Sequence, residues 1–367
     1  MRVLHVYAGN LYGGVEALLG VIARERSLAP QMEPAFALAW EGRLSRELRE
    51  AGVEVDVIGG ARLSRPWTVW SARRRLLQAI LQSSPDVAVL HSAWTWAVFA
   101  PAVRRAGVPA VFWLHDAPSG DLAERMARLA PPAVAVCTSE YVRGTLPRLF
   151  PHARGEVVYP PVSAPPPVPG ARAAVRAELE TSPDSVVIVQ ASRMEPWKGH
   201  RRHLQALGAM ADDPRWTCWL AGAAQRPREL RYRDELRALA AGLGIGGRVR
   251  WLGERGDIPR VLAAADLLCQ PNAGPEPFGI TYVEAMHAGL PVVTAATGGA
   301  AEIVTPRTGI LVDPADPAAL TDALRRLVGD AALRSRLGDA GPDRARELCD
   351  PARQLRRLHD VVQAVAG

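Results

Sequence analysis

One stretch of the chain shows how it folds: SVVIVQASRMEPWKGH, residues 185–200. Residues 185–190 are mostly β-branched or apolar and predict a buried strand. A turn containing Arg193 and Lys198 follows, and a helix is expected to begin near Gly199. A strand, a loop and a helix in this order form the repeating unit of a parallel sheet covered by helices.

The same alternation extends in both directions from this stretch. Strands are expected before it over Arg2–Tyr7, Pro34–Ala39, Val53–Ile58, Asp86–Leu90, Pro109–Leu114 and Ala133–Cys137, and after it over Thr217–Leu220, Arg248–Leu252, Asp266–Cys269, Pro291–Thr294 and Gly309–Val312. The pattern is interrupted once, by a proline-rich segment from Tyr159 to Gly170 that can neither pair in a sheet nor continue a helix. The sequence therefore predicts an α/β protein with two doubly wound parallel sheets: domains over 1–163 and 183–349, joined by a linker over 164–182.

Composition excludes several functional classes. No apolar run approaches the roughly 18 residues of a membrane span, and the N-terminus does not resemble a signal peptide, so we expect a cytoplasmic protein. The net charge of +6 is carried by arginines in helical stretches without interleaved aromatic residues, which argues against a nucleic-acid partner. The cysteines are far apart and mostly lie in apolar runs, as expected of core residues: Cys137, Cys218, Cys269 and Cys349.

Rare residues indicate where special chemistry is needed. Lys198 is the only lysine of the chain, and Asn10 and Asn272 are its only asparagines. All three follow predicted strands, where ligands of open α/β sheets bind. Arg193 and Lys198 flank a predicted helix start, so two cations and free backbone N–H groups converge as in a diphosphate site. The alternative is a solvated surface loop.

A second segment places two carboxylates near a helix start: NAGPEPFGITYVEAM, residues 272–286. Glu276 is expected in the loop and Glu284 in the helix that begins around Phe278 to Gly279. Their separation, about 12 Å along an ideal helix, is too great for a catalytic acid–base pair on one bond. The two carboxylates should contact different parts of one long ligand, unless they are only a helix-terminal charge and a solvated residue.

These two segments together resemble the retaining glycosyltransferases of family four, which have the GT-B fold. The shared pattern is Arg193 and Lys198 after the first strand of the second domain, then Glu276, Phe278-Gly279 and Glu284 in register. Further similarities are Gly298-Gly299 with Glu302, the run Gly289 to Val292, and Gly13 to Glu16. The resemblance implies two Rossmann-like domains facing a cleft, with the C-terminal helix (350–367) packed back on the first domain.

The resemblance also implies a role for each residue of the second-domain motif. Arg193 and Lys198 would stabilise the departing diphosphate, so that no metal and no cofactor are needed. Glu276 would bind the hydroxyls of the donor sugar and Glu284 those of the ribose, while backbone amides from Phe278 to Ile280, including Gly279, would orient the sugar. The expected donor is a UDP- or GDP-sugar, and the expected activity is that of a retaining hexosyltransferase.

In the first domain the resemblance is looser. Gly13 and Gly14 follow the first strand and would let the backbone approach donor phosphate, or they simply form a tight turn. His115 follows the strand ending at Leu114 and would face the donor sugar as a catalytic positioning residue, unless it is only a satisfied polar group. Asn10, Trp94 and Asp116 are candidates for acceptor contacts; for the tryptophans Trp94, Trp96 and Trp113, buried packing is the alternative.

Two other functions compete with glycosyl transfer: a sugar-nucleotide epimerase or phosphorylase of the same fold, and a non-catalytic sugar-nucleotide-binding protein. The partners expected are the nucleotide-sugar donor and a small-molecule, glycan or lipid-linked acceptor. Peripheral membrane contact, the acceptor and the oligomeric state are left open by the sequence.

Overall fold

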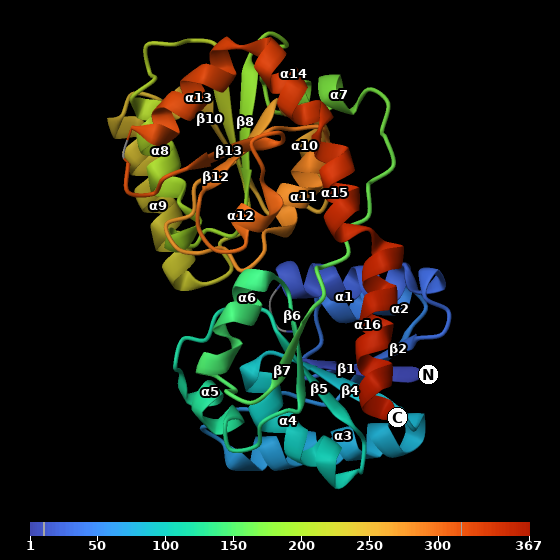
Figure 1. Cartoon of the computed structure of the whole chain (residues 1–367). Coiled ribbons are helices and arrows are strands. Elements are labelled where there is room, and N and C mark those ends of the chain that lie inside the picture. Colours follow the sequence, from blue (N-terminus) through green and yellow to red (C-terminus); the bar gives the residue numbers. More distant parts are fainter. Residues whose placement is uncertain (10–11, 317) are drawn as a thin grey trace. The chain divides into compact units, whose positions relative to one another are not determined.

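A computed structural model describes residues 1–9, 12–316 and 318–367 of the chain. The chain divides into two compact units, each built around its own parallel sheet (Figure 1). The N-terminal unit comprises Met1–Ser163 with Cys349–Gly367, and the C-terminal unit comprises Ala164–Leu348.

The N-terminal unit contains a parallel sheet with seven strands among its described residues, in the order β3-β2-β1-β4-β5-β6-β7. The strands are β1 (Arg2–Tyr7), β2 (Glu33–Leu38), β3 (Glu54–Val57), β4 (Val87–His91), β5 (Ala110–Leu114), β6 (Val134–Cys137) and β7 (Arg154–Val157). Its helices are α1 (Gly14–Arg24), α2 (Arg43–Glu50), α3 (Pro66–Ser83), α4 (Ala93–Arg105), α5 (Leu122–Ala127), α6 (Glu140–Thr145) and α16 (Pro351–Ala366), with short 3₁₀ turns η1 (Arg26–Leu28) and η2 (Leu146–Arg148).

Helices cover both faces of this sheet, because each strand presents apolar side chains to both sides. On one face α3 and α4 pack through residues such as Leu76 and Val98. On the other face α1, α2 and the C-terminal helix α16 pack through residues such as Leu18, Leu48 and Leu358. Helix α16 thus belongs to the core of the N-terminal unit, although it ends the chain.

The C-terminal unit contains six parallel strands among its described residues, in the order β10-β9-β8-β11-β12-β13. They are β8 (Val186–Ala191), β9 (Trp216–Ala221), β10 (Val249–Gly253), β11 (Leu267–Gln270), β12 (Val292–Ala295) and β13 (Gly309–Val312). The helices are α7 (Ala171–Glu178), α8 (His200–Gly208), α9 (Pro227–Gly242), α10 (Ile258–Ala264), α11 (Ile280–His287), α12 (Ala300–Ile303), α13 (Ala319–Gly329), α14 (Ala331–Asp339) and α15 (Gly341–Cys349), with 3₁₀ turns η3 (Pro196–Lys198) and η4 (Gly246–Arg248).

The core of this unit also has two sides. Helices α8, α9 and α13 pack on one face of the sheet, through residues such as Leu204, Leu236 and Leu324 (Figure 1). Helices α10 and α11 lie on the opposite side, where α7 packs against α10. The strand order 3-2-1-4-5-6 within this sheet is that of a Rossmann-like domain, so the predicted fold class is confirmed for both units.

The predicted strands are confirmed, with ends that differ by at most one residue. Strand β7 was not predicted, since its sequence Arg154-Gly155-Glu156-Val157 is short, polar and at the edge of the sheet. All four cysteines are buried and none is in a disulfide within the described part of the chain, as predicted. No helix in the described part of the chain is long and apolar enough to cross a bilayer.

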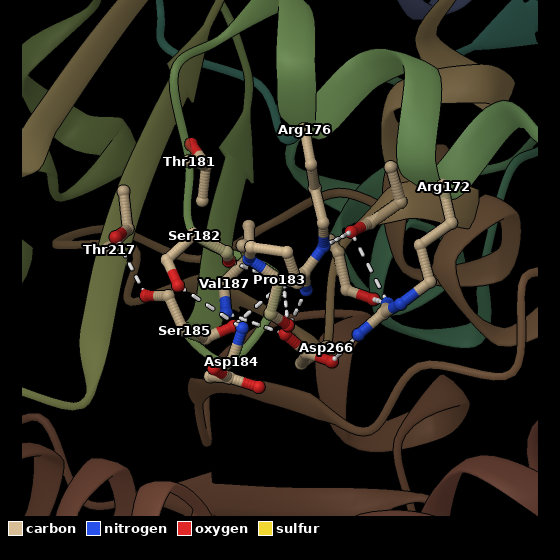
Figure 2. Close-up of polar contacts among 12 residues, drawn as sticks. Arg172, Arg176, Thr181, Ser182, Pro183, Asp184, Ser185, Val187, Thr217 and Asp266 are labelled. Atoms are coloured by element: carbon tan, nitrogen blue, oxygen red, sulfur yellow. Dashed lines mark hydrogen bonds and ion pairs between the residues drawn. The ribbon is translucent and has the colours of Figure 1, made fainter.

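The range expected to be a linker, 164–182, contains helix α7 and belongs to the C-terminal unit. The physical reason is a set of charged contacts that ties α7 to the start of β11 (Figure 2). Arg172 Nη2 and Arg176 Nη2 each lie 2.6 Å from a carboxylate oxygen of Asp266. The prolines before Gly170 correctly mark irregular structure, but the alanine- and arginine-rich sequence after it is a packed helix.

Arg176 is the centre of these contacts and is only 3% exposed. Its guanidinium donates to the carbonyl oxygens of Ser182, Pro183 and Ser185 and to that of Ala264, at 2.9–3.2 Å (Figure 2). Asp266 Oδ2 also accepts the backbone N–H of Val187 at 2.6 Å. Burial lowers the pKa of Arg176, but its ordinary value is so high that the group stays charged.

Candidate functional site

Three central strands of the C-terminal sheet end in buried polar residues. Gln190 is near the end of β8, Gln270 ends β11 and Thr294 lies in β12, and these strands are neighbours in the order β8-β11-β12. Because all three are parallel, their carboxyl ends meet at one edge, where ligands of open α/β sheets bind. Gln190 donates to the carbonyl oxygen of Lys198 at 2.8 Å and contacts His203 Nδ1 at 2.9 Å.

At this edge Glu276 is held by three donors. Its Oε2 accepts from Lys198 Nζ at 2.8 Å, from Asn272 Nδ2 at 2.6 Å and from Gln270 Nε2 at 3.2 Å. Glu276 and Asn272 are buried, and the Lys198 side chain is 15% exposed. A buried carboxylate with a charged partner and two amide donors is fixed in position, because moving it would leave charges unpaired.

The hydroxyl of Tyr282 extends this network beneath Glu276. It contacts Gln270 Nε2 at 3.2 Å and accepts from Thr294 Oγ1 at 2.9 Å. Burial, with the nearby Glu276 charge, raises the pKa of Tyr282 well above its ordinary value. Tyr282 is therefore a neutral hydrogen-bonding support.

Arg193 and Lys198 are positioned by the turn between β8 and α8. Arg193 Nη2 lies 3.1 Å from Glu195 Oε2, which also accepts from Trp197 Nε1 at 3.0 Å. Lys198 Nζ lies 3.9 Å from the centre of the Trp197 ring, a cation–π contact. Arg193 is about one-third exposed and uses only one of its five N–H donors in this ion pair, so further donors can reach a ligand.

Glycines allow the loops at this edge to approach each other closely. Gly199 has φ +78°, and a side chain there would collide with the carbonyl oxygen of Pro271. Gly298 has φ +64°, and a side chain there would collide with the backbone of Glu276. The backbone bonds Ala273 N–H to Trp197 O and Gly299 N–H to Glu276 O, both 2.7 Å, join the three loops.

Helix α11 begins beside this network. Gly279 caps it with φ +104°, a conformation that favours glycine, and Ile280 is its first residue. Phe278, just before the cap, is buried. The N–H of Tyr282 donates to the carbonyl oxygen of Gly279 at 2.9 Å. The start of the helix carries the positive end of the helix dipole, which suits an anion or a hydroxyl-rich ligand.

Glu284 lies on the second turn of α11, and its side chain differs from that of Glu276 in having no hydrogen bond or ion pair within the described residues. Its side chain is half-buried, and this burial raises its pKa from 4.5 to about 7. An acid buried without a partner is costly, and such groups concentrate at binding sites. Glu284 is thus a hydrogen-bonding group available to a ligand.

In the N-terminal unit, Gly13 caps α1 and Gly14 is the first residue of that helix. Asn10 lies outside the described residues. Trp94, partly exposed at the start of α4, packs against Trp40 with 5.4 Å between ring centres. Asp116 is exposed, directly after β5. Trp96 and Trp113 are fully buried, which makes them core residues.

His115 is buried at the end of a chain of three imidazoles. His115 Nε2 lies 2.9 Å from His91 Nδ1, and His91 Nε2 lies 3.0 Å from His5 Nδ1. Burial lowers the pKa of His5 and of His115 to about 3, and that of His91 well below its ordinary value. All three are therefore neutral at physiological pH, and His115 is left with Nδ1 for any further contact.

The structure thus brings Lys198 and Glu276 into direct contact and places Arg193, Phe278, Gly279, Ile280 and Glu284 on the adjoining loop and helix. Sequence reasoning missed the supporting residues: Gln190, Gln270, Tyr282 and Thr294, and it gave Asn272 no role beyond its rarity. The sequence did contain a signal for two of these supporting residues. Gln190 and Gln270 each follow an apolar strand sequence, where a polar residue must find partners.

Comparison with protein families identifies the class to which this fold and site belong. Residues 171–344 match the family "Glycosyl transferases group 1", and residues 36–164 match "Glycosyltransferase Family 4". Between them the two matches span most of both units. The chain belongs to the family-four glycosyltransferases, and the family predicted from the motifs is confirmed.

Among characterised relatives, the chain is 33% identical over 185 residues to a GDP-mannose-dependent phosphatidylinositol monomannoside mannosyltransferase of Corynebacterium glutamicum, covering 48% of this chain and 46% of that protein. It is 38% identical over 178 residues to a D-inositol 3-phosphate glycosyltransferase of Xylanimonas cellulosilytica, covering 47% and 42%. The matched segment is less than half the length of these relatives.

The whole chain resembles the crystal structure of Anabaena Alr3699/HepE in complex with UDP-glucose. The two share 25% identity and a TM-score of 0.87, over 99% of this chain and all of the other. A glycosyltransferase from Rickettsia africae has the same fold, with a TM-score of 0.86 at 18% identity over 99% of this chain and 98% of that one.

Proposed function

We propose that this protein is a retaining, metal-independent glycosyltransferase that moves a hexose from a nucleoside-diphosphate sugar to an acceptor hydroxyl. The observation that carries the proposal is the joining of Lys198 and Glu276 in one buried network beside the start of α11. That arrangement offers fixed positive charge, fixed acceptors and free helix N–H groups within one unit.

Arg193 and Lys198 stabilise the leaving diphosphate. When the bond between the sugar carbon and the diphosphate oxygen breaks, negative charge grows on that oxygen. Preorganised cations in a sheltered site stabilise such charge most effectively. Lys198 has three N–H donors, so it can hold Glu276 and a phosphate oxygen together, and Arg193 has donors beyond those that face Glu195.

Glu276 binds the donor sugar and Glu284 the ribose. Glu276 is held by donors at Oε2, which fixes the direction in which its other oxygen can accept a sugar hydroxyl. Glu284 has no protein partner among the described residues, and a ribose diol supplies two donors for its carboxylate. The amides of Phe278, Gly279 and Ile280 orient the sugar.

The donor is a UDP- or GDP-hexose. Support comes from the UDP-glucose complex of the similar Anabaena protein and from the GDP-mannose dependence named for the Corynebacterium relative. The acceptor is a small-molecule, glycan or lipid-linked hydroxyl, and the residues that contact it are those named from the sequence: Trp94, Asp116 and Asn10.

One experiment tests the reaction as a whole. UDP-glucose and GDP-mannose are each incubated with the protein and a panel of acceptors, and the products are examined by NMR. We expect an acceptor-dependent product with the anomeric configuration of the donor. An inverted product contradicts retention; an isomerised donor formed without acceptor would indicate an epimerase, and donor binding without turnover would indicate a binding protein.

A further inference from the structure

Helix α3 of the N-terminal unit exposes large apolar side chains to solvent. Trp67 and Trp70 are each 66% exposed, and Leu81 further along is 75% exposed. The opposite side of α3 is buried in the core through Ala72, Leu76 and Ile80. The exposed residues are therefore on the outer face of a helix that is already fixed to the sheet.

These residues form a single stripe. Trp67, Trp70, Arg74, Gln78 and Leu81 are spaced by three or four residues, which places them on one face of a helix. Arg74 lies over the Trp70 ring, with 5.9 Å from its guanidinium carbon to the ring centre. Single exposed apolar residues are common, but two neighbouring exposed tryptophans form a patch that indicates an interaction surface.

The segment that contains the stripe is strongly basic. Residues 57–85 include five arginines, namely Arg62, Arg65, Arg73, Arg74 and Arg75, and no aspartate or glutamate. None of these five forms an ion pair with any residue that the structure describes. Arg73 is committed to the carbonyl oxygens of Ala97 and Val98, so the charge open to a partner comes from the other four.

We propose that the outer face of α3 binds the surface of an anionic lipid membrane. Tryptophan prefers the boundary between headgroups and acyl chains, and arginines beside it attract anionic headgroups. Arg74 lies on the same face of α3 as the two tryptophans, Arg62 and Arg65 immediately precede the helix, and the segment contains no acidic residue that anionic headgroups would repel. Because the surface of a bilayer is flat, α3 can bind it without a pocket on the protein.

The position of α3 relates membrane binding to catalysis. This step of the inference rests on the proposed transferase function. The N-terminal end of α3, which contains Trp67, follows β3, and all strands of this sheet are parallel. The start of α3 therefore lies at the same edge as the loops containing Gly13 and His115. A membrane held there would present a lipid-linked hydroxyl to this edge, so the inferred acceptor class is a lipid-linked molecule.

Vesicle co-sedimentation of the full chain tests the proposal. We expect binding to vesicles that contain phosphatidylglycerol, weak binding to pure phosphatidylcholine vesicles, and loss of binding at high salt because surface charges are screened. Trp67→Ser with Trp70→Ser should lower the partition coefficient at least about 10-fold. Arg65→Glu with Arg74→Glu should abolish the preference for anionic vesicles.

Leu129→Ser is the matched control, because Leu129 is 84% exposed in the same unit and far from α3 in sequence. It should bind vesicles like the unaltered protein. Equal binding to neutral vesicles, unaltered binding by the tryptophan variant, or concentration-dependent dimerisation through Trp67 and Trp70 without vesicles would overturn the proposal. Donor affinity, measured by calorimetry, should be unchanged in the tryptophan variant; absent donor binding in the unaltered protein would instead contradict the transferase function.

Discussion

Lys198 Nζ lies 2.8 Å from Glu276 Oε2, and this contact joins the loop after β8 to the loop after β11. The resemblance to family four implies that Lys198 binds the diphosphate of the donor and that Glu276 binds its sugar. Their contact means that the group expected to hold the diphosphate also positions the group expected to hold the sugar. Loss of either residue should therefore affect both parts of the donor.

The first prediction concerns Lys198. Lys198→Ala should lower kcat about 10² to 10³-fold, equivalent to ~2.7–4 kcal/mol, because one preorganised partner of the leaving group is lost. Lys198→Arg should also be impaired, since a planar guanidinium cannot reproduce a compact ammonium between Glu276 and the Trp197 ring. Steady-state kinetics with the preferred donor measures both. A fully active alanine variant would show that the lysine is not part of the reaction.

The second prediction concerns metals. If Arg193 and Lys198 supply the positive charge to the diphosphate, as proposed, activity should survive dialysis against EDTA with kcat unchanged. The measurement is the initial rate before and after chelation, with and without added Mg²⁺ or Mn²⁺. Loss of turnover that either ion restores would contradict metal independence.

The third prediction concerns the attachment of α7. Arg176→Ala leaves Asp266 without its buried partner and several carbonyl groups without a donor, so it should destabilise the C-terminal unit by about 3–5 kcal/mol. Arg172→Ala removes the half-exposed partner of the same carboxylate and should cost at most about 1 kcal/mol. Urea denaturation followed by tryptophan fluorescence compares them. Equal losses would mean that burial of Arg176 is unimportant.

The fourth prediction concerns pH. Glu284, whose pKa is raised to about 7 by burial, is mostly protonated below that pH and then accepts hydrogen bonds poorly. Donor kcat/KM should therefore rise with pH through about 7, and Glu284→Gln should abolish the rise. His115 has a pKa lowered to about 3 and stays neutral over this range, so His115→Asn should retain the rise. A rise that disappears in the histidine variant would assign the titration to His115.

The fold could be predicted because the strands are nearly continuous apolar runs. Buried parallel strands such as β8 and β12 must be apolar on both faces, which distinguishes them from the helices between them. Strand β7 and helix α7 could not be recognised in this way. Strand β7 is short and polar at a sheet edge, and α7 is fixed by the Arg176–Asp266 contact between residues 90 positions apart.

The site could be predicted less completely than the fold. Rarity pointed to Lys198 and Asn272, and a motif pointed to Glu276 and Glu284, but sequence spacing gives no contacts between loops. Lys198 and Glu276 are 78 positions apart, and the loops that contain them approach each other closely where Gly199 lies against Pro271 and Gly298 against Glu276. The histidine chain likewise joins residues that are distant in sequence: His5 in β1, His91 in β4 and His115 just after β5.

The last prediction separates the two glutamates. Glu284, as the ribose ligand, contacts a part common to the sugar nucleotide and the free nucleoside diphosphate, so Glu284→Ala should weaken both to a similar degree, by about 1.5–3 kcal/mol. Glu276→Ala should lower kcat/KM for the full donor by more than it lowers diphosphate affinity, because the sugar hydroxyls are lost and the reacting carbon is misaligned. A smaller loss of diphosphate affinity is still expected, since Lys198 loses the carboxylate that holds it.

Glu276→Gln is the matched control: it keeps an acceptor for the sugar and for Lys198 but removes the charge. Calorimetry with free diphosphate and with sugar nucleotide measures each affinity. If Glu276→Ala loses the bare diphosphate as severely as Glu284→Ala does, then Glu276 does not act through the sugar, and the order of sugar and ribose along this loop and helix is wrong.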